Sequence, residues 1–284
     1  MIEIMLNNQW LQLLGLILTI ATGIWFFWEK FFRGVKWLIK RIKNWITSIK
    51  NQPSNPFFYK GYISPDDFFG RKALLRQIFE ELKKGTNLSL IGENEIGKTS
   101  LLHKVCQLGN QQLPEKIFIY LDMQKVTTEG DFFKSLCDKM NIPVCRSAEL
   151  EQALQGKQYV LCLDFIERMK SQLFSGNERT ELRGFAEGAN APLTLLIASH
   201  SSLNTLFPED DSRLESSPLA GICHNIDILP FNQTEVRDFI QTRLQPTGQQ
   251  FTEAEIAEIW QKTQGYPARI QAMAAQMYRQ KFDV

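Results

Sequence analysis

A glycine-rich turn between two apolar segments is the feature that most constrains this chain. Residues 87–102 read NLSLIGENEIGKTSLL, in which a short apolar run enters the pattern Gly-x-x-x-x-Gly-Lys-Thr and an apolar helical pattern follows. In this context the backbone N–H groups of the turn wrap phosphates, the lysine reaches the β- and γ-phosphates, and the threonine hydroxyl binds Mg²⁺. The sequence therefore predicts a phosphate-binding loop (P-loop) for ATP or ADP with Mg²⁺. The residues expected to bind the nucleotide there are Gly92, Glu93, Asn94, Glu95, Ile96, Gly97, Lys98, Thr99 and Ser100.

Two acids inside this loop, Glu93 and Glu95, have the wrong charge for a phosphate neighbour. Because a P-loop binds through its backbone, side chains at such positions can point away from the ligand. We therefore expect both carboxylates to face solvent.

Apolar runs recur downstream at intervals that a helix can fill. They cover residues 116–123, 158–165, 192–199 and 224–231. Helical patterns such as 129–141 and 174–188 lie between them. Near-continuous apolar strands that alternate with helices predict a parallel sheet covered on both faces. With the strand before the P-loop, the sequence predicts a five-stranded α/β core over residues 58–230.

The third of these strands ends in Asp164, whose carboxylate we expect to bind Mg²⁺ together with the Thr99 hydroxyl. Phe165 follows, and a phenyl ring can neither accept a proton nor orient a water for hydrolysis. Glu167 is the candidate substitute, since a helical turn after Asp164 places positions three apart on one side. It could equally cap or salt-bridge the start of a following helix. Lys98 and Glu167 are thus the candidate catalytic residues, and weak ATPase activity remains an open question.

Three other side chains are candidates for contact with the γ-phosphate. His200 ends the fourth strand, where it could contact phosphate or simply be a polar residue at a strand end. Arg183 and Arg269 could supply the cation that phosphoryl transfer needs, either from the lid or in trans from another molecule. Most surface arginines have no such role, so both interpretations stay open.

The C-terminal residues 231–284 contain three segments with apolar residues at helical spacing, 232–244, 252–264 and 267–280. Thr252 followed by Glu255 forms a capping-box pattern at the start of the second segment. We expect a small helical domain that folds over the nucleotide as a lid.

The N-terminus carries a long uncharged segment, Trp10 to Trp28, with Gln12 as its one strongly polar side chain. Nineteen residues reach about 28 Å as a helix, close to the ~30 Å hydrocarbon thickness of a bilayer. Tryptophans at both ends suit the two membrane interfaces. A signal peptide would need positive charge before the run and small residues after it, and the sequence has neither. We expect residues 1–28 to be a transmembrane anchor that spans the membrane once.

Residues 29–57 follow as a basic amphipathic juxtamembrane segment and linker. Seven of the 32 Lys and Arg residues lie in residues 1–50, against two of the 31 Asp and Glu residues. The positive-inside rule then puts the N-terminus outside and the remainder in the cytoplasm, at an inner or plasma membrane. A helix lying on anionic lipid and a stalk that continues the span both fit the segment. The remainder is mildly acidic, which argues against a nucleic-acid partner.

From Tyr62 to Met277 the chain resembles the STAND group of P-loop NTPases, which are related to AAA+ proteins in the additional-strand class. The segment FFGRKALLRQIFEEL resembles the family's Phe-x-Gly-Arg helix, which implies that Phe69, Gly70 and Arg71 lie near the adenine. The segment LTLLIASHSSLNTL resembles its sensor strand, with His200 where an arginine often stands. The segment TQGYPARIQAM supplies its Gly-x-Pro, whose proline, here Pro267, contacts the base or ribose.

This resemblance implies a nucleotide-dependent signalling or assembly switch with slow hydrolysis and with self-association or a protein partner. Phe165 keeps open a different class of protein, a membrane scaffold that holds ATP without hydrolysing it. A nucleic-acid-handling AAA+ relative is a third class, disfavoured by the acidic body and the expected anchor. The five scattered cysteines and three histidines lack metal-ligand spacing, which argues against a zinc enzyme.

Overall fold

The computed structural model describes residues 28, 34–43, 54–57, 61–208 and 219–282. The chain forms two compact units, Met1–Ser54 and Asn55–Val284. Apart from Trp28, the membrane anchor expected at residues 1–28 lies outside the described residues. Among the helices that are described, none has the length and apolar character needed to cross a bilayer.

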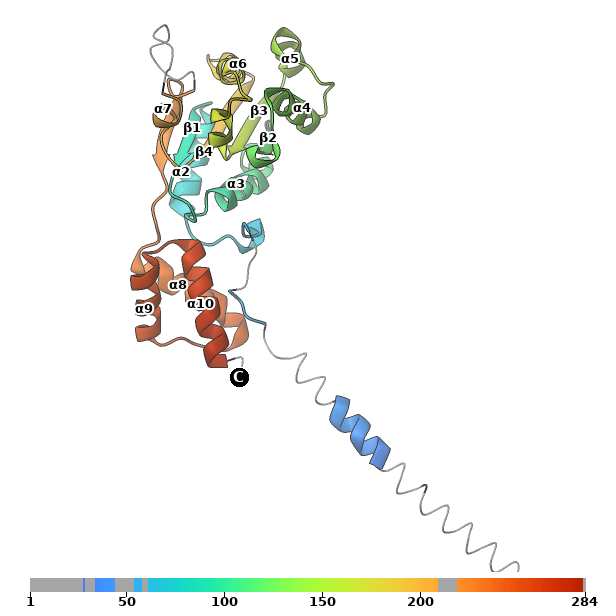
Figure 1. Ribbon diagram of the computed structural model, residues 1–284, viewed down its shortest axis with the longest axis vertical. Helices are drawn as coiled ribbons and strands as arrows, with labels where there is room; N and C mark the ends of the chain where they lie inside the picture. The colour runs from blue at the N-terminus through green and yellow to red at the C-terminus, as the bar shows by residue number, and fades with distance from the viewer. Residues whose placement is uncertain (1–27, 29–33, 44–53, 58–60, 209–218, 283–284) are drawn as a thin grey trace, which may run out of the picture. The chain divides into compact units, whose positions relative to one another are not determined.

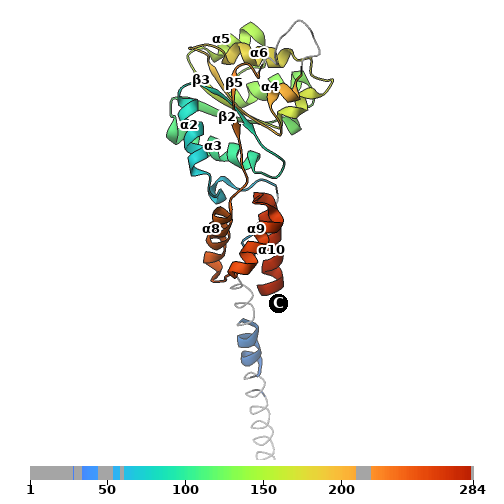
Figure 2. The same cartoon turned by 90° about the vertical axis from the view of Figure 1, so that its left-hand side faces the viewer.

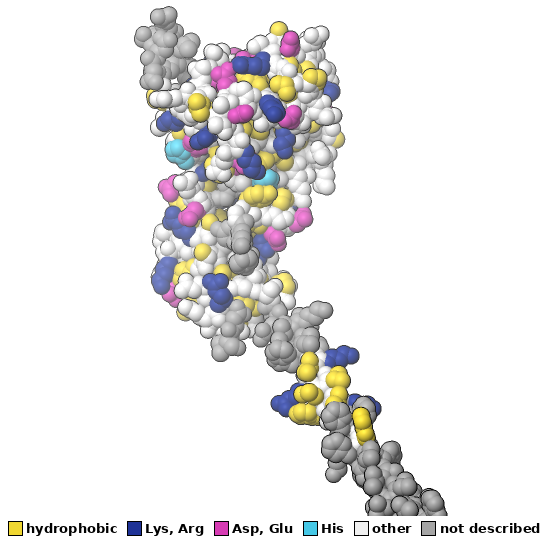
Figure 3. Space-filling model, turned by 45° about the vertical axis from the view of Figure 1, so that its right-hand side comes forward, with side chains coloured by type: hydrophobic (Ala, Val, Ile, Leu, Met, Phe, Trp, Pro, Cys, Tyr) yellow, Lys and Arg dark blue, Asp and Glu magenta, His cyan; other side chains and the backbone are white. Residues whose placement is uncertain are grey.

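In the first unit, residues 34–43 form a helix with two distinct faces. Val35, Leu38, Ile39 and Ile42 follow the i, i+3, i+4, i+7 spacing that aligns side chains in one apolar stripe. Lys36, Lys40, Arg41 and Lys43 lie outside this stripe, and Figure 3 shows hydrophobic and basic side chains next to each other on this helix. Ile39 is 58% exposed, so the apolar stripe is not covered by the described residues.

The second unit contains a five-stranded parallel sheet in the order β2-β3-β4-β1-β5 (Figure 1). The strands are β1 (Asn87–Ile91), β2 (Lys116–Asp122), β3 (Gln158–Asp164), β4 (Leu193–Ser199) and β5 (Cys223–Asp227). The predicted α/β fold with five parallel strands is confirmed. The order puts β1 between β4 and β5 and makes β3 and β4 neighbours, so their carboxyl ends meet at one edge of the sheet.

The last predicted strand, 224–231, is longer than the observed one. Ile228 N still donates to Ile91 O at 2.7 Å, but the chain then leaves the sheet. Pro230 has no N–H to donate to a ladder, which explains why pairing cannot continue. Phe231 N instead donates to Gly265 O at 2.9 Å, which joins the exit from the sheet to the C-terminal helices.

Helices cover both faces of the sheet, as Figure 2 shows for α2 and α3 on one side and α4 on the other. The helices of this part are α2 (Lys72–Lys83), α3 (Lys98–Gln112), α4 (Glu129–Met140), α5 (Ser147–Leu154), α6 (Asn177–Ala186) and α7 (Leu203–Leu206). Three short 3-10 helices connect them, η1 (Pro65–Asp67), η2 (Met123–Lys125) and η3 (Ile166–Lys170). Two apolar clusters fill the space between helices and sheet, one under α2 and α3 and one under α4, α5 and α6. The predicted helix 174–188 begins only at Asn177, because Gly176 turns the chain with a φ of 92°.

The C-terminal helices form a separate bundle with its own apolar cluster. They are α8 (Gln233–Leu244), η4 (Gln245–Thr247), α9 (Glu253–Thr263) and α10 (Pro267–Phe282). The capping box predicted from Thr252 and Glu255 is present at the start of α9. Phe57 is 1% exposed in this cluster and stacks on Phe251 with ring centroids 5.9 Å apart. The end of the segment assigned to the linker 29–57 is therefore packed into the bundle.

Candidate functional site

The P-loop connects the carboxyl end of β1 to the first turn of α3. Gly97, at a φ of 94°, caps the helix, and Lys98 is its first residue. The Lys98 ammonium lies back over the loop and donates to Gly92 O at 2.7 Å and to Glu93 O at 3.0 Å. Burial lowers the pKa of Lys98, while the negative charges of Glu167 and Asp164 act to raise it. Both carboxylates are therefore within electrostatic reach of this cation.

Asp164, at the end of β3, is 1% exposed, and both of its carboxylate oxygens accept hydrogen bonds. The Tyr120 hydroxyl donates to its Oδ2 at 3.0 Å, and Phe165 N donates to its Oδ1 at 3.1 Å. Burial raises the pKa of this carboxyl, and hydrogen bonds from the Thr99 and Tyr120 hydroxyls oppose that rise. The predicted metal ligands Thr99 and Asp164 are thus in contact, and Tyr120 is a partner that no sequence motif indicated.

These two oxygen donors fit a hard divalent cation such as Mg²⁺. Within residues 34–43, 54–57, 61–208 and 219–282, no group of three or more His, Cys, Asp or Glu side chains could hold a metal ion by itself. Mg²⁺ typically takes one or two protein oxygens and completes its shell with phosphate oxygens and water. Thr99 and Asp164 would hold the ion at the carboxyl edge of the sheet.

Glu167 and His200 come together across the neighbouring ends of β3 and β4. Phe165 has a φ of 56°, which turns the chain sharply, and η3 starts at the next residue. The expected helical turn after Asp164 is therefore present. Glu167 Oε1 accepts from His200 N at 2.6 Å and lies 2.7 Å from His200 Nδ1. The two candidate γ-phosphate residues thus contact each other, and Glu167 does not act as a simple helix cap.

A cavity of about 630 Å³ opens beside the P-loop. Residues 94–100 form one wall, and Phe165 and Tyr120 line the end nearest Asp164. The other end is aromatic and apolar, where the rings of Phe69 and Phe239 lie 5.3 Å apart at the base of the bundle. The expected base or ribose contact, Pro267, lines the same end. A cavity with a polar loop at one end and an apolar slot at the other suits a nucleotide.

Arg71 lies under the P-loop with one donor unused. Its guanidinium donates to Ile96 O and lies over the Phe231 ring at 5.4 Å. Burial lowers the pKa of Arg71 to about 10, so the side chain stays charged at neutral pH. Its Nη1 is buried and has no hydrogen-bond partner among the described residues. A buried cation with a free N–H beside Gly97 fits an anionic ligand. Gly70 does not line the 630 Å³ cavity.

The two acids of the P-loop contact the bundle. Glu93 Oε2 accepts from the Tyr266 hydroxyl at 2.6 Å, and Glu95 Oε2 accepts from Arg269 Nε at 2.9 Å. Arg269 also lies over the Tyr266 ring at 4.2 Å. We call these four residues the P-loop latch. Glu93 and Glu95 are exposed, as expected, and each also contacts a residue at or next to the start of α10.

The structure does not bring Arg183 to this site. Its guanidinium makes a two-pronged contact with Glu187 at 2.8 and 3.1 Å, one turn later on the same surface. Of the two candidate cations, only Arg269 lies at the rim of the P-loop.

Of the comparisons with known proteins, the one with solved structures identifies the fold. No family model matches the chain, and no curated protein matches it. Among solved structures, the Walker-type ATPase of Pyrococcus abyssi matches with a TM-score of 0.61 at 17% identity, over 80% of this chain and 72% of that one. Cdc6p from Pyrobaculum aerophilum matches with a TM-score of 0.57 at 16% identity, over 80% and 66% of the two chains. The ORC1 protein of Aeropyrum pernix, solved in complex with DNA, matches with a TM-score of 0.56 at 16% identity, over 76% and 62%.

The chain has the fold of the Walker-type P-loop ATPases. The match covers 62% of the ORC1 chain and 66% of the Cdc6p chain at 16% identity, so it supports the fold alone. What this chain binds and does is argued below from its own residues.

Proposed function

We propose that this chain is a membrane-anchored ATP-binding switch of the STAND type, in which nucleotide binding moves the helical bundle and hydrolysis is slow. The observation that carries this proposal is the P-loop latch, which joins the phosphate-binding loop directly to the bundle beside one cavity. A ligand that enters the cavity contacts the P-loop and the helical bundle at the same time.

Nucleotide binding follows from the charges around the P-loop. Lys98 and Arg71 supply two cations, and the free Nη1 of Arg71 gains a partner when an anion binds. Backbone N–H groups at the start of α3 add the positive end of a helix dipole. Mg²⁺, held by Thr99 and Asp164, would neutralise charge on the β- and γ-phosphate oxygens.

Slow hydrolysis follows from the position of Glu167. A carboxylate must accept a proton from the attacking water or orient it. Here the same oxygen of Glu167 accepts from the His200 backbone and lies against its imidazole. Hydrolysis then requires Glu167 to exchange a protein partner for water, and Phe165 offers no second carboxylate.

The switch uses competition for Arg269. In the latch this cation is paired with Glu95, on the loop where a triphosphate would lie. A bound triphosphate presents several negative charges to the Arg269 guanidinium. The attraction between phosphate and guanidinium is strong at short range in a partly enclosed site. Transfer of Arg269 from Glu95 to phosphate would change the contact between the loop and α10. The bundle then acts as the lid.

Membrane attachment rests on the sequence of residues 10–28 and on the helix of residues 34–43. The exposed apolar stripe and the basic remainder of that helix suit an anionic lipid surface on the cytoplasmic side. Self-association or a protein partner is part of the proposal because the STAND resemblance implies it. Membrane flotation of the full chain, with and without residues 1–28, tests the attachment.

The experiment that tests the nucleotide switch identifies the nucleotide that co-purifies with the chain and follows one turnover with Mg²⁺. ATP that becomes tightly held ADP supports the switch. A second candidate, the ATP-bound membrane scaffold, is favoured by Phe165 and by the contact between Glu167 and His200. ATP that stays unchanged over hours would support the scaffold instead.

A further inference from the structure

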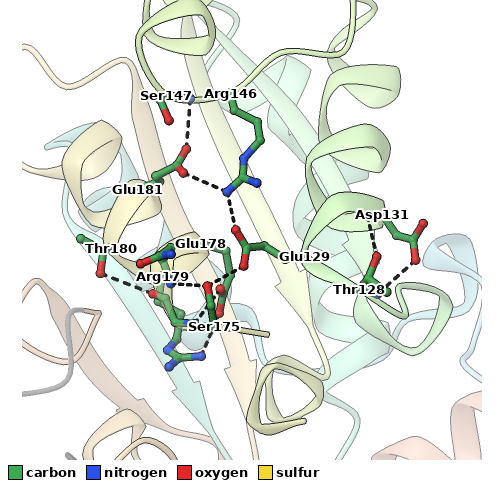
Figure 4. A network of polar contacts seen from close by, with 12 residues as sticks. Thr128, Glu129, Asp131, Arg146, Ser147, Ser175, Glu178, Arg179, Thr180 and Glu181 are labelled. Carbon is green, nitrogen blue, oxygen red and sulfur yellow. Dashed lines mark hydrogen bonds and ion pairs between the residues drawn. The ribbon is translucent and has the colours of Figure 1, made fainter. Parts of the chain in front are cut away.

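Glu178 and Arg179 form a buried ion pair on α6, drawn in Figure 4, and Arg179 contacts η3, the element that carries Glu167. Arg179 Nη1 donates to Glu178 Oε1 at 2.8 Å, and the two side chains are 16% and 0% exposed. Burial lowers the pKa of Arg179 and raises that of Glu178, so each charge is costly at this place. Buried pairs seldom repay their desolvation in stability, and in some proteins they fix one particular arrangement of the chain. We therefore examine which segments of the chain this pair holds in place.

Arg179 contacts the two chain segments that present the candidate γ-phosphate residues. Its Nη1 also donates to Met169 O at 3.1 Å, in the last turn of η3 and two residues after Glu167. Its guanidinium lies over the Phe207 ring at 4.4 Å, directly after α7, the helix that follows His200. One side chain thus contacts both η3, which carries Glu167, and the residue directly after α7, the helix that follows His200.

Apolar packing alone does not fix the orientation of η3. Ile166 and Met169 are buried, at 0% and 1% exposed, and they hold η3 against the core. Hydrophobic contact is non-directional, so it tolerates small rotations about the axis of η3. A charged donor to the Met169 carbonyl restricts that rotation, because hydrogen bonds weaken steeply away from their preferred geometry.

The loop between η3 and α6 is held from its outer side by a polar network, drawn in Figure 4. Glu129 on α4 accepts from the Ser175 hydroxyl at 2.6 Å and also pairs with Arg146. Arg146 in turn contacts Glu181 on α6 at 3.1 Å. Inside the same loop, Glu178 Oε2 accepts from Gly176 N at 3.0 Å. The segment that follows η3 is therefore fixed on both sides of the buried pair.

We propose that Arg179 is a positioning residue that sets the place of Glu167 through the Met169 carbonyl. This inference rests on the proposed role of Glu167 in hydrolysis for its functional meaning, but its structural part stands without it. Arg179 touches neither the P-loop nor the cavity lining, so it acts only through η3 and α7.

The test replaces the pair without leaving an unpaired buried charge. A double variant, Glu178→Gln with Arg179→Met, keeps the volume and removes both charges. The matched control is Glu187→Gln with Arg183→Met, which removes the exposed pair at the other end of α6. Amide hydrogen exchange of the full chain is measured over residues 165–171 without added nucleotide, and thermal unfolding verifies that each variant is folded.

The expected result is exchange at residues 166–170 that is about tenfold faster in the buried-pair variant and unchanged in the control, since local opening becomes easier. Unchanged exchange in a folded buried-pair variant overturns the proposal. ATP turnover is the second measurement. In the buried-pair variant kcat should fall by about tenfold or more while the nucleotide Kd stays within about twofold, because a misplaced catalytic group slows the reaction without weakening binding. Adding Glu167→Gln should lower kcat no further.

The two hypotheses fail in different ways. If Glu167→Gln leaves kcat unchanged while exchange still rises in the buried-pair variant, the proposed function is wrong and Arg179 still holds η3. If Glu167→Gln abolishes turnover while the buried-pair variant keeps wild-type kcat and exchange, Arg179 has no positioning role.

Discussion

Glu167 Oε1 lies 2.7 Å from His200 Nδ1 and accepts the His200 backbone N–H at 2.6 Å. The pair forms because β3 and β4 are neighbours in the sheet, so the residues after their carboxyl ends meet. It places the candidate catalytic carboxylate, Glu167, at the edge where Lys98 and Asp164 also lie.

Replacing Glu167 tests whether this carboxylate serves hydrolysis. Glu167→Gln should lower single-turnover hydrolysis by about 10²-fold or more, in line with the loss of a general base, while nucleotide affinity changes little. Phe165→Glu should leave the rate unchanged, because a carboxylate at the position after Asp164 adds nothing if Glu167 already acts. If the rate instead rises with Phe165→Glu and is unchanged by Glu167→Gln, this chain lacks the catalytic carboxylate at the position after Asp164, and Glu167 does not replace it.

The P-loop latch predicts a charge effect on nucleotide affinity. Glu95→Gln removes an acid beside the phosphates and frees Arg269. ATP affinity should rise by about twofold to fivefold at low salt, as expected for one exposed charge, and the gain should shrink at high salt. Glu253→Gln, which breaks a pair with Arg237 elsewhere in the bundle, is the matched control. Equal affinities for the two variants at low salt would contradict the latch.

The connection between sheet and bundle depends on a glycine without space for a side chain. A Cβ on Gly265 would lie 2.0 Å from Phe231 O, at a φ of 75°. Gly265→Ala should cost about 3 kcal/mol or more in free energy of unfolding, since a backbone clash adds to left-handed strain. Gly248→Ala, at a φ of 69° with nothing within 4 Å, should cost only the strain of about 1 kcal/mol. Urea unfolding measures both, and similar losses would refute the clash.

The buried Asp164 carboxylate, proposed to bind Mg²⁺, should lower the stability of the folded chain at neutral pH. Burial raises the pKa of its carboxyl in the folded chain, so the folded state binds this proton more tightly than the unfolded state. Ionised Asp164 therefore lowers the free energy of unfolding. This loss grows as pH rises from the pKa of the unfolded chain to the higher pKa of the folded chain, and it is complete above the latter. Asp164→Asn should therefore raise Tm at pH 7, and the gain should vanish below the ordinary carboxyl pKa of about 4. A gain that persists in acid would point to another cause.

Much of the fold could be predicted from the sequence because the patterns that determine each strand and helix lie within single short segments. Four of the five predicted strands match the structure within one residue at each end, since apolar runs and the P-loop pattern lie within single segments. The fifth ends early at a proline that the sequence displays, Pro230. Thr252 and Glu255 form their predicted capping box for the same local reason.

The parts of the site that sequence reasoning missed depend on distant partners. Tyr120 reaches Asp164 only because β2 and β3 pair in register, and no motif announces that hydroxyl. The latch joins Glu95 to Arg269 across 174 positions. Arg179 lies in an ordinary helical pattern, and only the fold shows that it contacts Met169 O. Spacing along the chain carries no information about such contacts.

The central claim is that this chain binds a nucleotide through its P-loop, and the most direct measurement is equilibrium binding of a fluorescent ATP analogue with Mg²⁺. Wild type and Lys98→Ala are compared in the full chain, with Lys104→Ala on the same helix as control. We expect wild type and the control to bind alike and Lys98→Ala to lose about 10²-fold or more in affinity, because a charged donor to two phosphates is removed. Equal affinity of Lys98→Ala and wild type would contradict the account.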